Sequence, residues 1–266
     1  MKADGALGLL DDAADAVGRL PAWVGLLWFT ALPVRFVLAA LAIRLVEMGA
    51  EAVHHAFWMR RMAFLLLATW LVSLWGRQVF VQACRHAFQS LRPPPASLLR
   101  IPPAAMAGHL VAALTVEALF WALLPTLVAP ALLILLAPLA AAAAPAGGPG
   151  PVDALSALAR GIGPVSRLLR LLLLFALVLP IAAVNLHWLC AAIAWLAAGI
   201  PGIRIEPWEA VLNPGNPGYA ILLFSGALLL LEPFWLAAVT AHVERVRARS
   251  TGDDLRRWFA ELRAAS

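Results

Sequence analysis

Long apolar stretches, separated by short polar or proline-rich segments, dominate the pattern along this 266-residue chain. They run over Pro21 to Arg44, Arg61 to Cys84, Pro103 to Ala144, Leu168 to Ile200 and Gly218 to His242. A helix needs about 20 residues to cross the hydrocarbon core of a bilayer. Each stretch is therefore long enough to span a membrane, and the pattern predicts an all-α, polytopic bundle of transmembrane helices.

Two of the stretches exceed the length of a single span. Pro103 to Ala144 covers 42 residues, and Pro125 and Pro130 interrupt it near the middle, so it is expected to form a helical hairpin. Leu168 to Ile200 contains Pro180, but the part up to this proline has only 13 residues, too few to cross a bilayer. We interpret it as one kinked helix. The prediction is then six spans, all within residues 21–243.

Basic residues orient these spans, because cytoplasmic loops are enriched in Lys and Arg. The six-span arrangement places fourteen basic residues on one side and three on the other. The larger set is Lys2, Arg19, Arg85, Arg92, Arg100, Arg160, Arg167, Arg170, Arg245, Arg247, Arg249, Arg256, Arg257 and Arg263, and the smaller set is Arg60, Arg61 and Arg204. Both ends of the chain are therefore predicted to be cytoplasmic. Acidic residues interrupt the first twenty positions, so no cleaved secretion signal is expected.

Amphipathic segments flank the spans. At the carboxyl end, within residues 244–266, the sequence "STGD" is interpreted as a helix start, and an apolar stripe follows at helical spacing: Leu255, Trp258, Phe259 and Leu262. This stripe is predicted to dock on the membrane surface or on a cytoplasmic partner, or else to pack beneath its own bundle. Residues 4–20 have a weaker stripe, Leu7, Leu10, Ala14 and Val17, opposite Asp12 and Asp15.

Two linkers divide the chain without creating a separate domain, so residues 1–266 are interpreted as a single transmembrane domain. "APAGGPGPVD", from Ala144 to Asp153, combines proline with glycine and is expected to be a flexible, non-helical connection. "SLRPPPASLLRIPP", from Ser90 to Pro103, is expected to be a stiffer loop of polyproline character.

Composition agrees with this class and excludes others. Hydrophobic residues make up 63% of the chain and charged residues 13%, which leaves too little polar surface to cover a soluble globule. The net charge of +5 comes from arginines spread over many loops, without the compact basic patch of a nucleic-acid-binding protein. Membrane lipids are therefore the expected surroundings, and no nucleic acid is expected as a partner.

Charged residues inside the spans are the candidate functional groups. Glu232 lies near the bilayer midplane in this topology, where an unpaired charge costs several kcal/mol. Arg35 on the first span lies at a matching depth and is the predicted partner. Arg77 and Glu117, on the second and third spans, form a second possible pair whose depths match less closely.

Two interpretations of these pairs remain open. They could form a proton or ion relay, or a polar site in a transport path. Alternatively, they are structural ion pairs that fix which helix lies beside which, with little net gain in stability. The structural interpretation is favoured, because a relay usually needs more titratable groups in series than this chain provides.

The remaining polar residues of the spans point to structure rather than chemistry. Pro233 is expected to bend the last span and to free a carbonyl one turn earlier. Asn185 and His187, which follow Pro180, are expected to satisfy backbone groups freed at that kink, or to line a cavity. Several tryptophans fall near span boundaries, where indole rings anchor helices.

Known catalytic and metal-binding motifs are not found in the sequence. It has no Gly-x-Ser-x-Gly elbow, His-Glu-x-x-His motif or phosphate-binding loop, so the protein is not predicted to be an enzyme or to bind a cofactor. Glu51, His54 and His55 have the acid and histidine spacing of dimetal helical bundles, but a second set is lacking. No metal site is predicted.

Four features of the last hundred residues form a recognisable pattern: Pro233 and Phe234, the basic stretch Arg245 to Arg249, the pair Asp254 and Leu255, and the lead-in "ALSALARGIGPVSRLLRLLLLFALVLPIAAVN". In these features the chain resembles a family of uncharacterised bacterial multi-span proteins. Related proteins include the membrane domain of some glycerophosphoryl diester phosphodiesterases. The resemblance implies a location in the bacterial inner membrane. It also implies neighbours such as MoxR-type ATPases, and a role in assembly or in the envelope.

Together these features predict a membrane anchor or assembly component of a larger bacterial complex, bound to one or more protein partners through its cytoplasmic segments. The alternative is a transporter or lipid-handling protein that uses Arg35, Arg77, Glu117 and Glu232.

Overall fold

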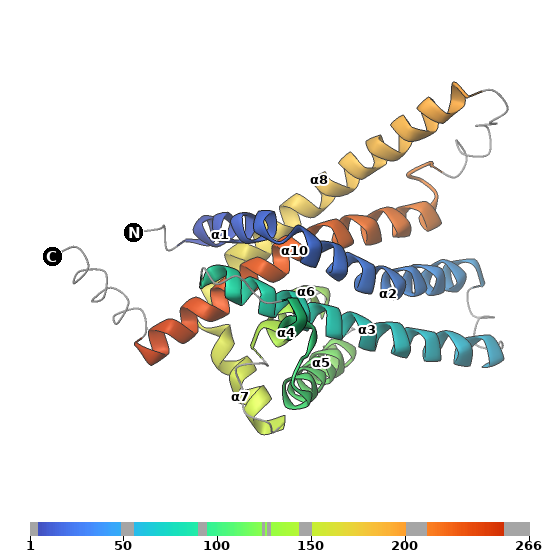
Figure 1. Cartoon of the computed structure of the whole chain (residues 1–266). Coiled ribbons are helices and arrows are strands. Elements are labelled where there is room, and N and C mark those ends of the chain that lie inside the picture. The colour runs from blue at the N-terminus through green and yellow to red at the C-terminus, as the bar shows by residue number, and fades with distance from the viewer. Residues whose placement is uncertain are drawn as a thin grey trace. The chain divides into compact units, whose positions relative to one another are not determined.

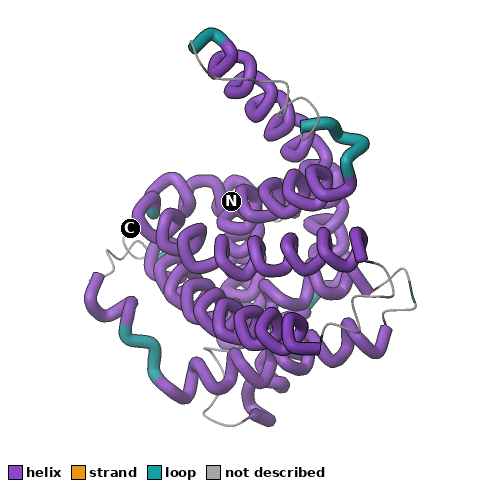
Figure 2. Tube along the Cα trace, turned by 90° about the vertical axis from the view of Figure 1, so that its right-hand side faces the viewer, coloured by secondary structure: helices purple, strands orange, loops and turns teal. Residues whose placement is uncertain are grey.

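The computed structural model describes residues 5–48, 56–89, 95–123, 126, 129–143, 151–200 and 212–252. Over these residues the chain consists of helices joined by loops and turns, with no strand (Figure 2). The helices, labelled in Figure 1, are α1 (Ala6–Arg19), α2 (Pro21–Met48), α3 (Ala56–Phe88), α4 (Pro95–Leu99), α5 (Pro103–Leu123), α6 (Ala129–Ala143), α7 (Pro151–Ile162), α8 (Val165–Ala198) and α10 (Pro217–Thr251). The predicted all-α class is confirmed for the described part of the chain.

Among the residues that the structure describes, five helices are long and apolar enough to cross a membrane: parts of α2, α3 and α5, and the whole of α8 and α10. The 42-residue stretch is divided as expected into α5 and α6, which pack against each other. However, α6 has only 15 residues, which is shorter than a full span. The other long stretch forms the single helix α8 with Pro180 inside it, as predicted.

The chain forms two compact units, and the division falls inside α2, α3, α8 and α10. Unit 1 comprises Met1–Val24, Arg77–Leu173 and Phe234–Ser266, and unit 2 comprises Gly25–Gly76 and Leu174–Pro233. In unit 1, α5, α6 and α7 contact one another. The core of this unit includes Leu9, Phe80, Leu98, Leu139 and Leu236, all nearly or completely buried.

Unit 2 exposes many large apolar side chains. Phe29 on α2, Phe64 on α3 and Trp195 on α8 are 76%, 74% and 76% exposed. In water, such continuous apolar surface would be strongly unfavourable, whereas lipid hydrocarbon would cover it without cost. The helices of this unit therefore have the surface expected of membrane-spanning segments.

Within unit 2, α2 and α3 approach closely at Gly76. A β-carbon added at Gly76 would overlap the side chain of Thr30, which is itself buried. The Thr30 hydroxyl donates to the carbonyls of Leu26 and Leu27 in its own helix, at 3.0 Å each. The missing side chain of Gly76 thus lets the two helices meet at a small polar residue, as is common between membrane helices.

In α1, the buried residues are Ala6, Gly8, Leu9, Ala13 and Ala16, whereas Leu7 of the predicted apolar stripe is 67% exposed.

Two predictions about loops were wrong. Pro95–Leu99, predicted as part of a polyproline loop, forms α4, and Pro151 begins α7 inside the segment predicted to be non-helical. Proline is tolerated in the first turn of a helix because its missing N–H has no partner there.

The segment "STGD" contains the end of α10. Ser250 and Thr251 are the last residues of this helix, and Gly252 follows with φ of 71°. A glycine in this left-handed conformation ends a helix. The predicted docking stripe, Leu255, Trp258, Phe259 and Leu262, lies outside the described residues.

Candidate functional site

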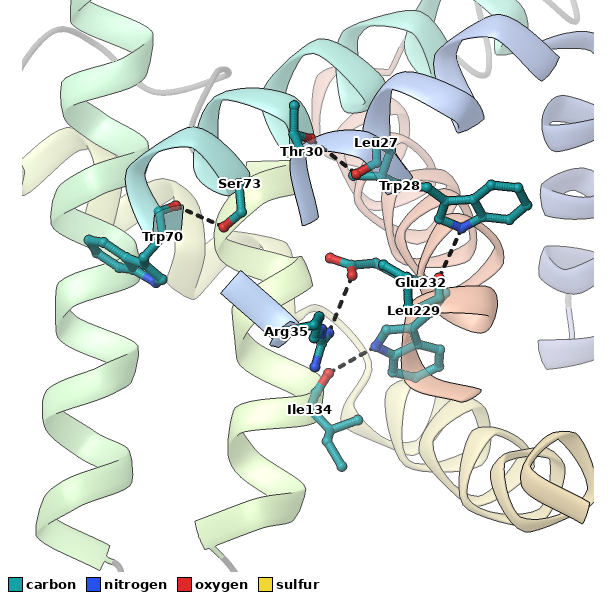
Figure 3. Close-up of polar contacts among 10 residues, drawn as sticks. Leu27, Trp28, Thr30, Arg35, Trp70, Ser73, Ile134, Leu229 and Glu232 are labelled. Carbon is teal, nitrogen blue, oxygen red and sulfur yellow. Dashed lines mark hydrogen bonds and ion pairs between the residues drawn. The ribbon is translucent and has the colours of Figure 1, made fainter. Parts of the chain in front are cut away.

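The intramembrane ion pair of unit 2 joins α2 to α10. Arg35 Nη2 lies 3.3 Å from Glu232 Oε2, and the two side chains are 23% and 8% exposed (Figure 3). Arg35 therefore contacts Glu232, the partner predicted from the similar depths of the two residues in their spans. Because the arginine is a permanent cation and Glu232 is buried beside it, the pair lowers the cost of placing either charge in hydrocarbon.

A second polar contact joins the same two helices next to this pair. Pro233 has no N–H, so the carbonyl of Leu229, four residues earlier, has no helical partner. The indole Nε1 of Trp28 donates a 2.9 Å hydrogen bond to this Leu229 oxygen (Figure 3). The carbonyl that Pro233 was predicted to free is thus satisfied by a tryptophan of another helix.

The same arrangement occurs in unit 1. Pro138 lies inside α6 and frees the carbonyl of Ile134. The Nε1 of Trp235, on α10, donates a 2.8 Å hydrogen bond to that oxygen. Two interior prolines are thus each matched by an indole from a neighbouring helix, which satisfies the freed backbone oxygen without water.

The second predicted pair lies within unit 1. Arg77 on α3 and Glu117 on α5 are both half-buried, and Arg77 acts electrostatically on Glu117 and on His109. His109 is 1% exposed, and its Nδ1 has no hydrogen-bond partner among the described residues. Arg77 is thus in electrostatic range of Glu117, and a direct ion pair between them stays a prediction.

The residues after Pro180 do not satisfy the backbone of the kink, contrary to the prediction. Asn185 is exposed, and His187 Nδ1 is 2.9 Å from the hydroxyl of Tyr219 on α10. The two rings of this histidine and tyrosine meet edge to face, with centroids 5.8 Å apart. His187 therefore ties α8 to the beginning of α10 in unit 2.

A denser group of charges lies in unit 1, where α1, α3 and α10 meet. Arg85 Nε is 2.9 Å from Glu244 Oε1, and Arg245 Nη2 is 2.5 Å from Asp12 Oδ2. Arg85 also donates a 2.6 Å hydrogen bond to the carbonyl of Ala142 at the end of α6. A cavity of about 440 Å³ adjoins both pairs.

Sequence reasoning missed this charged group. In the sequence, Arg85 and Arg245 have the positions of loop charges that orient the spans, and Asp12 lies on the polar side of an amphipathic segment. One signal was present: Glu244 and Arg245 directly follow a long apolar stretch on a continuous helix, so both must lie at its polar end. Their partners are far away in sequence, and only the fold brings them together.

Metal chemistry has no support in the described residues. They contain no group of three or more His, Cys, Asp or Glu side chains placed to hold a metal ion. Glu51, His54 and His55 lie outside the described part of the chain.

Comparisons with protein-family models, curated proteins and solved structures found no match to this chain. The apolar helices indicate an integral, multi-pass membrane protein. Because no related protein was found, any proposal about function rests on the polar and charged contacts described above.

Proposed function

We propose that the protein is a membrane anchor or assembly component of a larger bacterial inner-membrane complex, with six spans and both ends cytoplasmic. The observation that carries this proposal is that the polar groups of the spans connect one helix to another. The Arg35–Glu232 ion pair and the indole bonds of Trp28 and Trp235 each connect one helix to another. Such contacts specify helix neighbours, as a static scaffold requires.

The family relationship belongs to the same proposal. The Pro233 and Phe234 pair and the basic stretch after it are the features shared with multi-span proteins related to the membrane domain of glycerophosphoryl diester phosphodiesterases. Under this proposal, α6 belongs to the fourth of the six spans, and the charged ends of α1, α3 and α10 face the cytoplasm. A partner would bind the cytoplasmic tail.

The test is affinity purification of the full chain in mild detergent. Replacing Leu255, Trp258 and Phe259 with serine should release a co-purifying protein partner while the helical content of the bundle is kept. The matched control replaces Arg256 and Arg257 with glutamine, outside the apolar stripe. Retention of every partner by the serine variant would contradict the docking role of the tail.

A second candidate function is transport, favoured by the presence of a charged pair inside the membrane-spanning part of unit 2. If Glu232 carries a proton or ion, Glu232→Gln should abolish flux into proteoliposomes without lowering the yield of folded protein. A loss of yield alone would favour the structural role.

A further inference from the structure

The charged cavity of unit 1 carries more positive than negative groups. Its lining includes Asp12 and Asp15 of α1 with Arg19, Arg85 of α3, and Glu244, Arg245 and Arg247 of α10. These are four arginines and three carboxylates. Because charged side chains of α1, α3 and α10 line the cavity, its net charge decides which ligand it can accept.

Three of the arginines already have carboxylate partners. Arg85 pairs with Glu244 at 2.9 Å, Arg245 with Asp12 at 2.5 Å, and Arg19 with Asp15 at 2.7 Å. The fourth, Arg247, is exposed and has no ion-pair partner within the described residues. It acts electrostatically on Arg85, a like charge. An anion placed in the cavity would relieve this repulsion and neutralise the surplus positive charge.

A second cavity shares one lining residue, Arg247, with the first. It has a volume of about 260 Å³ and lies between the end of α6, α7 and α10. Its apolar lining comes from Ala143, Ala157, Val243 and Val246, and Arg160 and Arg247 supply positive charge. A charged cavity and an apolar cavity that share one arginine fit a molecule with an anionic head and an apolar body.

We propose that these two cavities bind an anionic glycerophospholipid, with its phosphate at Arg247 in the charged cavity and part of its glycerol and acyl region in the apolar one. Arginine forms paired hydrogen bonds to phosphate oxygens and is the usual residue at such sites. This lipid site is additional to the proposed anchor function, but it rests on the membrane orientation proposed there. That orientation places both cavities at the cytoplasmic leaflet, where anionic lipids attract basic groups.

The binding test uses the full chain in nanodiscs of phosphatidylcholine alone or with phosphatidylglycerol added. Phosphatidylglycerol should raise the thermal unfolding temperature and remain bound in native mass spectrometry. Arg247→Gln should weaken this binding about fivefold, the contribution of one basic residue near a membrane surface. The matched control is Arg249→Gln, because Arg249 is an exposed arginine of the same helix that lines neither cavity.

A second variant tests the same charge balance in the opposite direction. Asp15→Asn removes the exposed partner of Arg19 and increases the surplus positive charge, so it should strengthen retention of phosphatidylglycerol. This variant keeps the proposal testable if Arg247→Gln lowers the yield. Weaker or unchanged retention in Asp15→Asn would overturn the proposed electrostatic basis.

The remaining outcomes also decide the proposal. If sn-glycerol 3-phosphate or inorganic phosphate stabilises the protein in phosphatidylcholine nanodiscs as strongly as phosphatidylglycerol does, the ligand is a soluble phosphate and the lipid assignment is overturned. Equal losses in the Arg247 and Arg249 variants would mean diffuse surface attraction and no built site. Both faces of a nanodisc are accessible, so failure of binding here is distinct from a wrong orientation, which reporter fusions detect separately.

Discussion

At the scale of single residues, two tryptophans satisfy carbonyls that prolines have freed. The sequence predicts that Pro233 frees a carbonyl one turn earlier, because proline has no N–H, and in the structure that carbonyl belongs to Leu229. The donor, Trp28, lies 201 positions away, and nothing in its local sequence indicates this role. The cost of an unpaired carbonyl in hydrocarbon explains why a distant indole is bound there.

A double-mutant cycle tests this contact. Trp28→Phe removes the donor and should destabilise the protein by about 1 to 2 kcal/mol. In a Pro233→Ala background, the residue at position 233 supplies its own N–H to Leu229, so the same Trp28→Phe change should cost much less. Unfolding in mixed detergent micelles measures both values. Equal costs in the two backgrounds would contradict the proposed link.

The Arg35–Glu232 pair makes a second prediction at this scale. Glu232→Ala leaves the Arg35 cation without its carboxylate in the spans and should destabilise the protein by about 3 kcal/mol. Replacing both residues together, Arg35→Met with Glu232→Leu, should recover most of that loss, because no buried charge remains. Thermal unfolding in detergent is the measurement, and an unchanged stability of Glu232→Ala would show that the pair lies in water.

At the scale of elements, the positions of the helices could be predicted far better than their buried faces. Apolar length alone identifies α2, α3, α8 and α10, because a span must be long and uniformly apolar. In α1, Leu7 is exposed, whereas Leu9 and small residues such as Ala13 are buried. Small residues allow close backbone approach, so the packed face of α1 consists mostly of small residues around one leucine and does not follow the apolar stripe.

Close approach at Gly76 gives a prediction for a pair of elements. Gly76→Ala introduces a β-carbon that overlaps Thr30 and should destabilise the contact of α2 with α3 by about 1 to 3 kcal/mol. Gly25→Ala is the matched control, because a β-carbon at Gly25 meets nothing within 4 Å. The control should be neutral or slightly stabilising, since alanine favours helix over glycine. Detergent unfolding of both variants checks the difference.

At the scale of the whole molecule, the sequence was sufficient for the class of protein but not for its polar sites. Composition and apolar length predicted helices suited to a membrane, and unit 2 has the exposed apolar surface that such helices need. The charged cavity of unit 1 joins Asp12, Arg85 and Glu244 from three distant segments. In the sequence alone, such charged residues cannot be distinguished from ordinary loop residues, because only the fold brings them together.

The orientation of the chain is the claim on which the docking tail and the lipid site both depend. A reporter fused after Ser266 tests it most directly, with green fluorescent protein and alkaline phosphatase as the two alternatives. A cytoplasmic carboxyl end should give a fluorescent first fusion and an inactive second one, because the basic residues that follow the last apolar stretch hold this end in the cytoplasm. An active phosphatase fusion without fluorescence would place the tail outside the cytoplasm and contradict the proposed orientation.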